Sequence, residues 1–556
     1  MRRFLFLAGL VSLGFGGCSS SDDDSPRSTG GTTDETSPIP PGNPGSEGGG
    51  LVAIQDCADG LQNGNETAVD CGGSCRPCLN AAPCNVDGDC ISSFCDGICR
   101  GWATGFSSES TTVVVRDVAV SPVDASLYAA ATHNGRIDLD GQIVETDNGD
   151  PDPANHDNWL VVKTDPGGAV QWAVSLGGSG VDRAIAVGVD EAGRVDVMGT
   201  CRAGFVAGSE VEADGDHLCL LELDPEDGAV LWGRTFLSGD VSPTAMWVDP
   251  VGGDIFVVGS ARTRIELSNA LSPTGADGFV ARLSGTDGRS LDSAFFTGSG
   301  DDEPRNIAVE GDVLAVVGST TSATMTVGGV PLGRIAGDPG DDRDGWVVRM
   351  DRALTPTAQA RFGTAETEVT AVAGVAVGRD GSVFIAGMTD TDHLPVAGAG
   401  LEDDRFEGTR TIAARLFSEG EAEDWSRALG TVGDNDVFAG EVRGHPLTGA
   451  IFVTASIAGE GIDIDGLSYT KTNAPRDGIA VSFNPITGDA VSIFGAVGSL
   501  VEAESTGQPD LVFTPFGGGI MSGTVVAPGG VRGGQVFVPA SSETVPDGFL
   551  KGFGSR

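Results

Sequence analysis

Residues 277–283 have the sequence DGFVARL, and residues 344–350 have the sequence DGWVVRM. The phrase, an Asp-Gly pair or a variant of it followed by a short apolar run, occurs seven times along the chain. The other copies are DNWLVVKT (157–164), DHLCLLEL (216–223), RTIAARL (410–416), DGIAVSF (477–483) and DGFLKGF (547–553). The copies are about sixty to seventy residues apart, and self-similarity at a fixed period predicts a repeat architecture.

Three further phrases accompany each copy. One precedes it and mostly ends in Gly plus a hydroxyl residue, as in IFVVGS (255–260) and LAVVGS (314–319). Another lies earlier still, as in NIAVEG (306–311), and a last one closes most repeats, as in VQWAVSL (170–176) and VLWGRTF (230–236). All are short, apolar or alternating, and bounded by Gly, Asp or Pro, which predicts β-strands; no comparable stretch has helical periodicity.

Four short strands per repeat, repeated seven times, predict an all-β fold: a seven-bladed β-propeller over residues 101–556. A four-stranded sheet has two apolar faces, and stacking each blade against its neighbours in a closed ring buries both. The last repeat stops after its third phrase, whereas WATGF (102–106) before the first repeat matches the missing fourth. We therefore expect this N-terminal segment to pair with the last blade and protect its edge.

The four phrases in this order resemble the bacterial seven-bladed propeller repeat (SBBP type), over residues 102–553. The resemblance implies an exported propeller and supplies no catalytic residues.

The N-terminal region predicts export. Residues 1–18 carry Arg2 and Arg3 before an apolar run that is too short to span a membrane, as in a secretory signal. The end of this run, FGGC, resembles a bacterial lipobox, which implies lipidation at Cys18; the alternative is plain cleavage and secretion. Residues 19–55 are mostly Ser, Asp, Gly, Pro and Thr, which predicts a disordered linker. Ser19 resembles an outer-membrane sorting signal, so we expect an anchor at the bacterial outer membrane, with exposure at the cell surface left open.

Residues 56–100 hold eight cysteines and predict a small disulfide module in an oxidising compartment. These are Cys57, Cys71, Cys75, Cys78, Cys84, Cys90, Cys95 and Cys99. The first half resembles a Cys-rich module of exported myxobacterial-type proteins. Zinc is the weaker interpretation, because the module has no His and export would oxidise the thiols. Spacing does not fix the pairing.

Two further features leave alternatives open. Asp59, Asn63, Glu66 and Asp70 offer oxygen ligands for calcium, or else form turns by bonding their own backbone. Cys201 and Cys219 lie in neighbouring predicted strands, where they form either a disulfide or two small buried apolar residues.

Every loop that joins one predicted blade to the next contains an acid. Representatives are Asp182, Asp240, Asp301, Glu366, Asp434 and Glu502. A ring of carboxylates around a central funnel would hold Ca²⁺ or a cationic ligand; alternatively, so acidic a chain simply places acids in most solvated loops. The long connections between the second and third strands, such as 133–156 and 320–343, are where we expect binding to reside.

The chain has 33 Lys+Arg and 79 Asp+Glu, a formal charge of -46, which excludes nucleic acid as a partner and leaves the lipid as the only membrane contact. No zincin, nucleophile-elbow, P-loop or dinucleotide motif is present. We therefore expect a non-catalytic binding or scaffold protein for a protein, glycan or matrix partner. The alternatives are a carbohydrate-active enzyme that uses funnel carboxylates and a structural calcium-binding envelope protein. No cofactor is expected with certainty, and calcium is the candidate.

Overall fold

The computed structural model describes parts of residues 62–95, most of 102–106 and 112–498, and residues 510–513, 518–525 and 547–554. Several sequence predictions lie outside the described residues: Cys18 and the linker, Cys57, Cys99, Asp59, Asn63, Asp70, Glu366, Asp434 and Glu502. The regular elements of the described part are all β-strands. A search of these residues finds no helix long and apolar enough to cross a bilayer.

Six blades in the described part each take four strands from one repeat. The first three blades are β2 (Val113–Val120), β3 (Leu127–His133), β6 (Asn158–Thr164) and β7 (Val170–Leu176); β8 (Arg183–Val189), β9 (Val195–Cys201), β10 (Asp216–Leu223) and β11 (Val230–Gly239); and β12 (Val241–Val248), β13 (Ile255–Ala261), β16 (Asp277–Leu283) and β17 (Ser290–Thr297). The next three are β18 (Asp302–Glu310), β19 (Val313–Thr320), β22 (Asp344–Asp351) and β23 (Pro356–Phe362); β24 (Thr370–Val377), β25 (Val383–Thr389), β28 (Arg410–Leu416) and β29 (Trp425–Leu429); and β30 (Val437–Gly444), β31 (Ile451–Ile457), β34 (Asp477–Phe483) and β35 (Ala490–Gly498). All neighbouring strands within these blades are antiparallel.

A further sheet joins the two ends of the propeller chain. Its order is β1-β38-β37-β36, with β36 (Asp510–Phe513), β37 (Gly518–Val525), β38 (Asp547–Gly554) and β1 (Trp102–Phe106). The antiparallel register pairs Trp102 with Gly552 and Phe106 with Gly548. The predicted pairing of WATGF with the last repeat is therefore confirmed.

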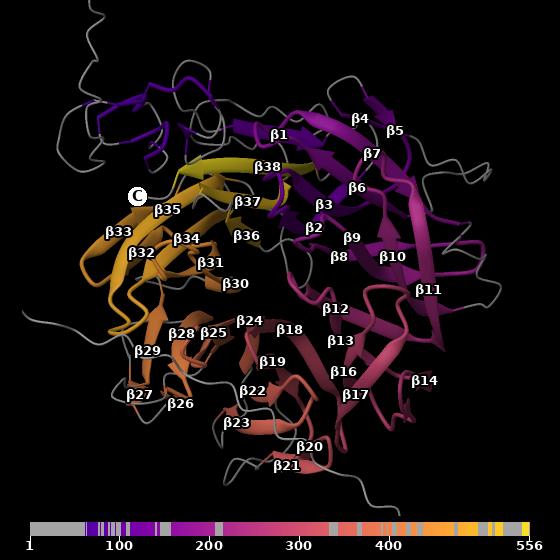
Figure 1. Ribbon diagram of the computed structural model, residues 1–556. Helices are drawn as coiled ribbons and strands as arrows, with labels where there is room; N and C mark the ends of the chain where they lie inside the picture. The colour runs from indigo at the N-terminus through magenta and orange to yellow at the C-terminus, as the bar shows by residue number, and fades with distance from the viewer. Residues whose placement is uncertain are drawn as a thin grey trace, which may run out of the picture. The chain divides into compact units, whose positions relative to one another are not determined.

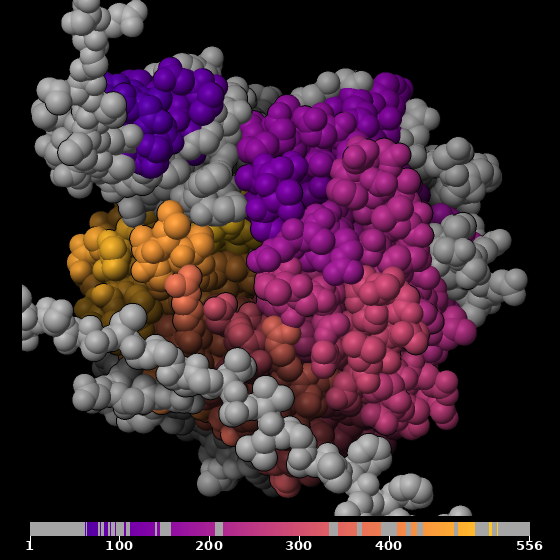
Figure 2. Space-filling view, viewed as in Figure 1, coloured from indigo at the N-terminus to yellow at the C-terminus, as the bar shows by residue number. Residues whose placement is uncertain are grey.

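The first strands of the sheets form a closed cycle of contacts. β2 contacts β8, and the contacts continue through β12, β18, β24 and β30 to β36, which contacts β2 again. Figure 1 shows the sheets following one another around a common centre, and in Figure 2 the colour passes around the visible face in chain order. The fold is an all-β propeller.

Apolar packing between blades explains why the second strand of a blade is so uniformly apolar. β3, β9, β13 and β31 are buried along their whole length, because both their faces meet a neighbouring blade. One cluster joins Tyr128 and Trp159 of the first blade to Val197 and Leu221 of the second. The Gly of the second phrase permits close packing: a Cβ on Gly318 would lie 2.5 Å from the Trp346 ring.

The long connections between second and third strands, where we expect binding to reside, contain β-hairpins. They are β4 (Ile137–Leu139) with β5 (Gln142–Val144), β14 (Ile265–Glu266) with β15 (Ala270–Leu271), β20 (Met325–Val327) with β21 (Val330–Leu332), β26 (His393–Val396) with β27 (Ala399–Glu402), and β32 (Gly461–Ile464) with β33 (Leu467–Thr470). The first strand of each contacts the outermost strand of the preceding blade, as β4 contacts β1 and β20 contacts β17. The β20 hairpin pairs with β17 and extends that sheet to six strands, whereas the other four form separate two-stranded sheets beside the outermost strands.

In the fourth blade, the Asp-Gly phrase lies inside the propeller. Asp344 begins β22 with its side chain fully buried, and its Oδ2 accepts a bond of 2.6 Å from Arg361 Nε. Gly345 follows because the next blade is close: a Cβ there would lie 3.0 Å from the Val372 side chain. In this copy, the Asp forms an ion pair within its own blade, and the Gly lies at the contact with the next blade.

Candidate functional site

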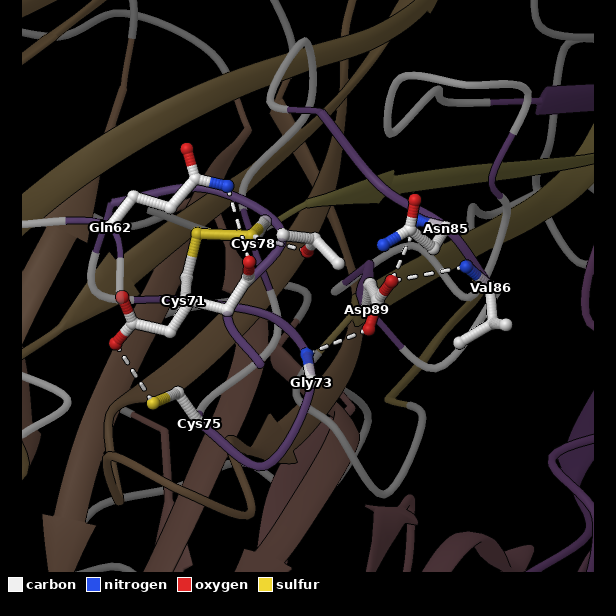
Figure 3. Close-up of a disulfide and its surroundings, with 10 residues drawn as sticks. Gln62, Cys71, Gly73, Cys75, Cys78, Asn85, Val86 and Asp89 are labelled. Carbon is white, nitrogen blue, oxygen red and sulfur yellow. Dashed lines mark hydrogen bonds between the residues drawn. A yellow bond between two sulfur atoms is a disulfide. The ribbon is translucent and has the colours of Figure 1, made fainter. Parts of the chain in front are cut away.

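The described part of the cysteine-rich module is held by disulfides. Cys71 bonds Cys78, and Cys84 bonds Cys95. Cys75 and Cys90 are disulfide-bonded as well. Figure 3 shows the first of these bonds and its surroundings. The sulfurs of Cys84, Cys90 and Cys95 lie within 4.8 Å of one another, but oxidised sulfur does not supply the thiolate that a zinc site needs.

Asp89, which the sequence analysis did not single out, organises this module. Its carboxylate accepts backbone N–H bonds from Gly73 (2.8 Å), Asn85 (2.7 Å) and Val86 (3.0 Å), and joins two Cys-rich segments (Figure 3). Burial alone would raise the pKa of Asp89, but these donors together hold it below its ordinary value. Asp89 lies three residues after Val86, in the stretch DGDC (87–90), and no sequence feature distinguishes it from a turn residue.

Of the four residues predicted for calcium, Glu66 is the one that the structure describes. It is buried, and its Oε1 lies 3.1 Å from the disulfide sulfur of Cys75. Whether this module binds calcium stays a prediction.

Asp182 is the first of the three described funnel acids, and it is fully buried. Its oxygens accept the backbone N–H groups of Gly178 (2.8 Å) and Arg202 (2.7 Å), so it ties two loops of the same face together. Burial raises the pKa of Asp182 to about 6, despite those two bonds. Its oxygens are engaged by the protein itself.

Asp240 and Asp301 occupy different environments. The side chain of Asp240 is exposed, and its backbone bonds Thr263 and Arg262. Asp301 accepts the Ala276 N–H at 2.8 Å and forms an ion pair with Arg262 at 3.3 Å. Burial favours a higher pKa for Asp301, but the Ala276 N–H and Arg262 outweigh it and hold the pKa low. The structure thus gives these three acids separate roles, and their capture of a cation stays a prediction.

Asp302, next to Asp301, is a buried acid that the sequence analysis did not choose. It accepts hydrogen bonds from the Thr320 and Ser322 hydroxyls. Burial raises its pKa to about 6, with Asp277 adding to the effect. Asp301, Asp302 and Glu303 are consecutive in the sequence, but only Asp302, the first residue of β18, is buried.

The first strands carry a recurring β-bulge, which was not apparent from the sequence. The register of β2, β8, β12, β18, β24 and β30 shifts at the same place in each. Polar side chains beside the bulge link blades: Thr244 Oγ1 donates to the Pro304 carbonyl at 2.9 Å, and Asn306 Nδ2 donates to both Glu441 oxygens at 2.9 Å. Bulges re-aim side chains, and here the described polar groups hold first strands together.

A groove lies between the second and third blades. It has a volume of about 580 Å³ and is lined by Arg234, Thr235, Phe236, Leu237, Arg264, Glu266, Leu267, Arg289 and Ser290. These residues come from the outermost strand β11, from hairpin strand β14 and its turn, and from the start of β17. Three arginines against one glutamate give the lining a positive balance in a chain of charge -46.

All three arginines of this groove have partners within the protein, but two of them remain exposed to solvent. Arg234 donates to the Asp287 carbonyl at 3.0 Å. Arg264 forms an ion pair with Glu266 (2.6 Å) and Arg289 one with Asp287 (2.5 Å), and both arginine side chains are more than half exposed. Exposed pairs of this kind are weak and exchange readily for another anion.

Comparisons with known proteins return fold-level likenesses to solved structures. No family model matches the chain, and no curated protein matches it. The quinohemoprotein alcohol dehydrogenase of Comamonas testosteroni is similar at 10% identity and a TM-score of 0.35, covering 82% of this chain and 77% of its own. A protein of unknown function from Dyadobacter fermentans has 12% identity and a TM-score of 0.36, covering 81% and 97%. The inulosucrase of Halalkalicoccus jeotgali has 11% identity and a TM-score of 0.25, covering 58% and 88%.

Proposed function

We propose that this chain is a non-catalytic binding propeller of the bacterial cell envelope. In this proposal the sheet of β36, β37, β38 and β1 is the seventh blade, and the repeats are of the bacterial seven-bladed type. The closed cycle of contacts among first strands supports the seventh blade, because β36 contacts both β30 and β2.

The observation that carries the binding role is the groove between the second and third blades. A concave surface with convergent polar groups is the usual form of a recognition site, and this one gathers Arg264 and Arg289 beside the exposed Leu237. Its walls are strands and a hairpin rather than long loops, so it is preformed and loses little entropy when it is occupied.

The contacts that the described carboxylates make within the protein favour a binding role over glycoside cleavage. A glycosidase of the usual kind needs two carboxyl groups that face a shared substrate at a fixed separation. Asp182 is engaged by two backbone N–H groups, Asp301 by Ala276 and Arg262, and Asp302 by two hydroxyls. These carboxylates serve loop and blade contacts.

The envelope location rests on Cys18 and on the disulfides. Oxidised cysteines on both β9 and the N-terminal module fit an exported protein. Lipidation predicts that the wild-type chain sediments with membranes and that Cys18→Ala moves it to the soluble fraction. Fractionation with immunodetection measures this, and a membrane-bound Cys18→Ala protein would exclude the anchor.

The test of the function uses the full mature chain on intact envelopes. Cross-linking followed by purification and mass spectrometry is expected to recover a defined partner in stoichiometric yield. A parallel assay incubates the chain with envelope polysaccharides and measures released reducing ends, which should stay at the level of a heat-treated control. Turnover above that control would replace the proposal with the carbohydrate-active alternative, and a chelator effect on stability would add calcium to it.

A further inference from the structure

The bulge in the first strands places an arginine at the same position in two blades. In β2 the unpaired residue of the bulge is Arg116, and in β18 it is Arg305. Each follows the third residue pair that its strand makes with the second strand of the blade. The first strands form the inner edge of the ring, as Figure 1 shows for β2 and β18. Both arginines therefore lie at the same level of that inner edge.

In β18 the fold itself shows which partner a guanidinium at this position takes. Arg305 Nη2 donates to Glu303 Oε2 at 2.9 Å, and Glu303 lies two residues earlier on the same strand. Glu303 belongs to the second residue pair of β18, and the residue in the second pair of β2 is Val114. The carboxylate that Arg305 finds on its own strand is therefore replaced by an apolar side chain in the case of Arg116.

Arg116 has no equivalent bond within the described part of the chain. Its Nε is buried and has no hydrogen-bond partner there. The acid next to it, Asp117, accepts the backbone N–H groups of Val118 and Val187. A half-buried charge without a counter-charge costs free energy, and proteins keep such groups chiefly at functional sites. Arg116 is therefore a candidate for contact with a ligand.

A second guanidinium lies near Arg116. Burial lowers the pKa of Arg116 to about 10, with repulsion by Arg183 adding to the effect and attraction by Asp157 opposing it. Arg183 begins β8 and forms an ion pair with Asp157 at 3.5 Å, and the Arg183 side chain is 42% exposed. Two arginines thus share one carboxylate, and an anion from solvent would relieve the repulsion between them.

The narrowness of the ring at this level favours a small ligand. Asn306, the residue after Arg305, donates to Glu441 of β30 at 2.9 Å. Strand β24 lies between β18 and β30 in the cycle of contacts. First strands that are two steps apart therefore come within reach of a single hydrogen bond. Inner edges that approach so closely favour an anion of a few atoms over a segment of a polymer.

We infer that Arg116, with Arg183 beside it, binds a small organic dicarboxylate at the inner edge of the first and second blades. One carboxylate takes the place that Glu303 has beside Arg305, through paired N–H bonds from the guanidinium. The other carboxylate meets Arg183. This site is additional to the proposed function and does not depend on the groove between the second and third blades, so each can fail without the other.

The experiment titrates malonate into the full mature chain by isothermal titration calorimetry, with sodium chloride holding the ionic strength constant. Inorganic phosphate is the comparison anion. The test variants are Arg116→Gln and Arg183→Gln. The matched control is Arg305→Gln, because Arg305 has the same register position and already has Glu303 as its partner. Labelling with phenylglyoxal, followed by mass spectrometry, reports the accessibility of each arginine separately.

Malonate should bind saturably, and Arg116→Gln and Arg183→Gln should each weaken it by about tenfold or more, while Arg305→Gln leaves it unchanged. Malonate should also slow the labelling of Arg116 and leave that of Arg305 unchanged. Without malonate, Arg116→Gln should melt no lower than the wild type, because it removes a charge that has no partner.

Three results would overturn the inference: no saturable binding of malonate, an equal loss in Arg116→Gln and Arg305→Gln, or tighter binding of phosphate than of malonate. A lower melting temperature of Arg116→Gln without malonate would also overturn it, since the guanidinium would then have a partner within the protein. Recovery of a partner from envelopes despite any of these results would leave the proposed function standing.

Discussion

At the scale of single residues, several acidic side chains of this chain are buried inside the propeller. Asp196 of β9 lies opposite Glu222 of β10, and both are buried. Glu222 accepts the Trp232 indole N–H at 2.8 Å, whereas Asp196 Oδ1 has no hydrogen-bond partner. Burial, with Glu222 beside it, raises the pKa of Asp196 well above its ordinary value. An unpartnered acid of this kind costs stability whenever it is ionised.

The first prediction concerns the pH dependence that Asp196 causes. Because its folded pKa is raised, its favourable contribution is complete below the ordinary pKa of 3.8 and is lost as pH rises toward the folded value. Asp196→Asn should therefore raise the free energy of unfolding by about 1–3 kcal/mol at pH 8 and change it little at pH 4. Urea unfolding at both pH values measures this, with the exposed Asp240→Asn as control. Equal effects at the two pH values would contradict it.

The second prediction concerns the close approach at Gly318. A Cβ there would lie 2.2 Å from the Glu303 carbonyl oxygen and 2.5 Å from the Trp346 ring, so backbone must move to admit it. Gly318→Ala should lower the free energy of unfolding by about 1–3 kcal/mol, the usual range for overpacking. Gly444→Ala is the control, since the nearest atom to its Cβ is 4.0 Å away. Equal stability of the two variants in a thermal melt would refute the packing argument.

At the scale of elements, the pieces that the repeat pattern did not reveal are the hairpins. Their strands are two to four residues long, as with β14 and β32, and periodicity is hard to recognise over so few residues. The disulfide between Cys201 and Cys219 works at the same scale. It joins β9 to β10 across an 18-residue separation with Cα atoms 6.0 Å apart, and both cysteines are fully buried. Of the two alternatives, the structure has the disulfide.

The third prediction follows from that bond. Cys201→Ala with Cys219→Ala should lower the free energy of unfolding by about 3 kcal/mol, because the unfolded chain regains the freedom of the closed loop. Urea unfolding of the oxidised wild type against the double variant measures the difference. Treatment of the double variant with dithiothreitol controls for the other disulfides, since its further loss belongs to the N-terminal module. Identical midpoints for wild type and double variant would show that the bond does not form in solution.

At the scale of the whole molecule, the ring depends on pairing its two ends. β1 and β38 lie 440 residues or more apart in the sequence. They pair at five positions, and this pairing joins the two ends of the propeller chain. Removing β1 would leave β38 as an uncovered edge, open to pairing with another chain.

The fourth prediction tests this closure with two truncations. Deletion of residues 1–100 retains β1 and should melt near the temperature of the full mature chain. Deletion of residues 1–106 removes β1 and should melt several degrees lower and form oligomers, since an exposed edge favours association. Differential scanning calorimetry and size-exclusion chromatography provide the readouts. A monomeric, equally stable 1–106 deletion would mean that the ring closes without the N-terminal strand.

The sequence by itself determined the all-β class, the positions of the blade strands and the pairing of β1 with β38. These follow from local patterns, because alternation and bounding glycines recur in every repeat and a missing fourth phrase has one candidate to replace it. Tertiary structure decided which acids are buried: Asp301 and Asp302 are adjacent in sequence, yet one pairs with Arg262 in solvent and the other lies between hydroxyls at a blade contact. It also decided the groove, since Arg234, Arg264 and Arg289 are brought together from two blades. Their proximity depends on how far a hairpin reaches over its neighbour's edge, a distance that packing sets and that no spacing in one sequence encodes.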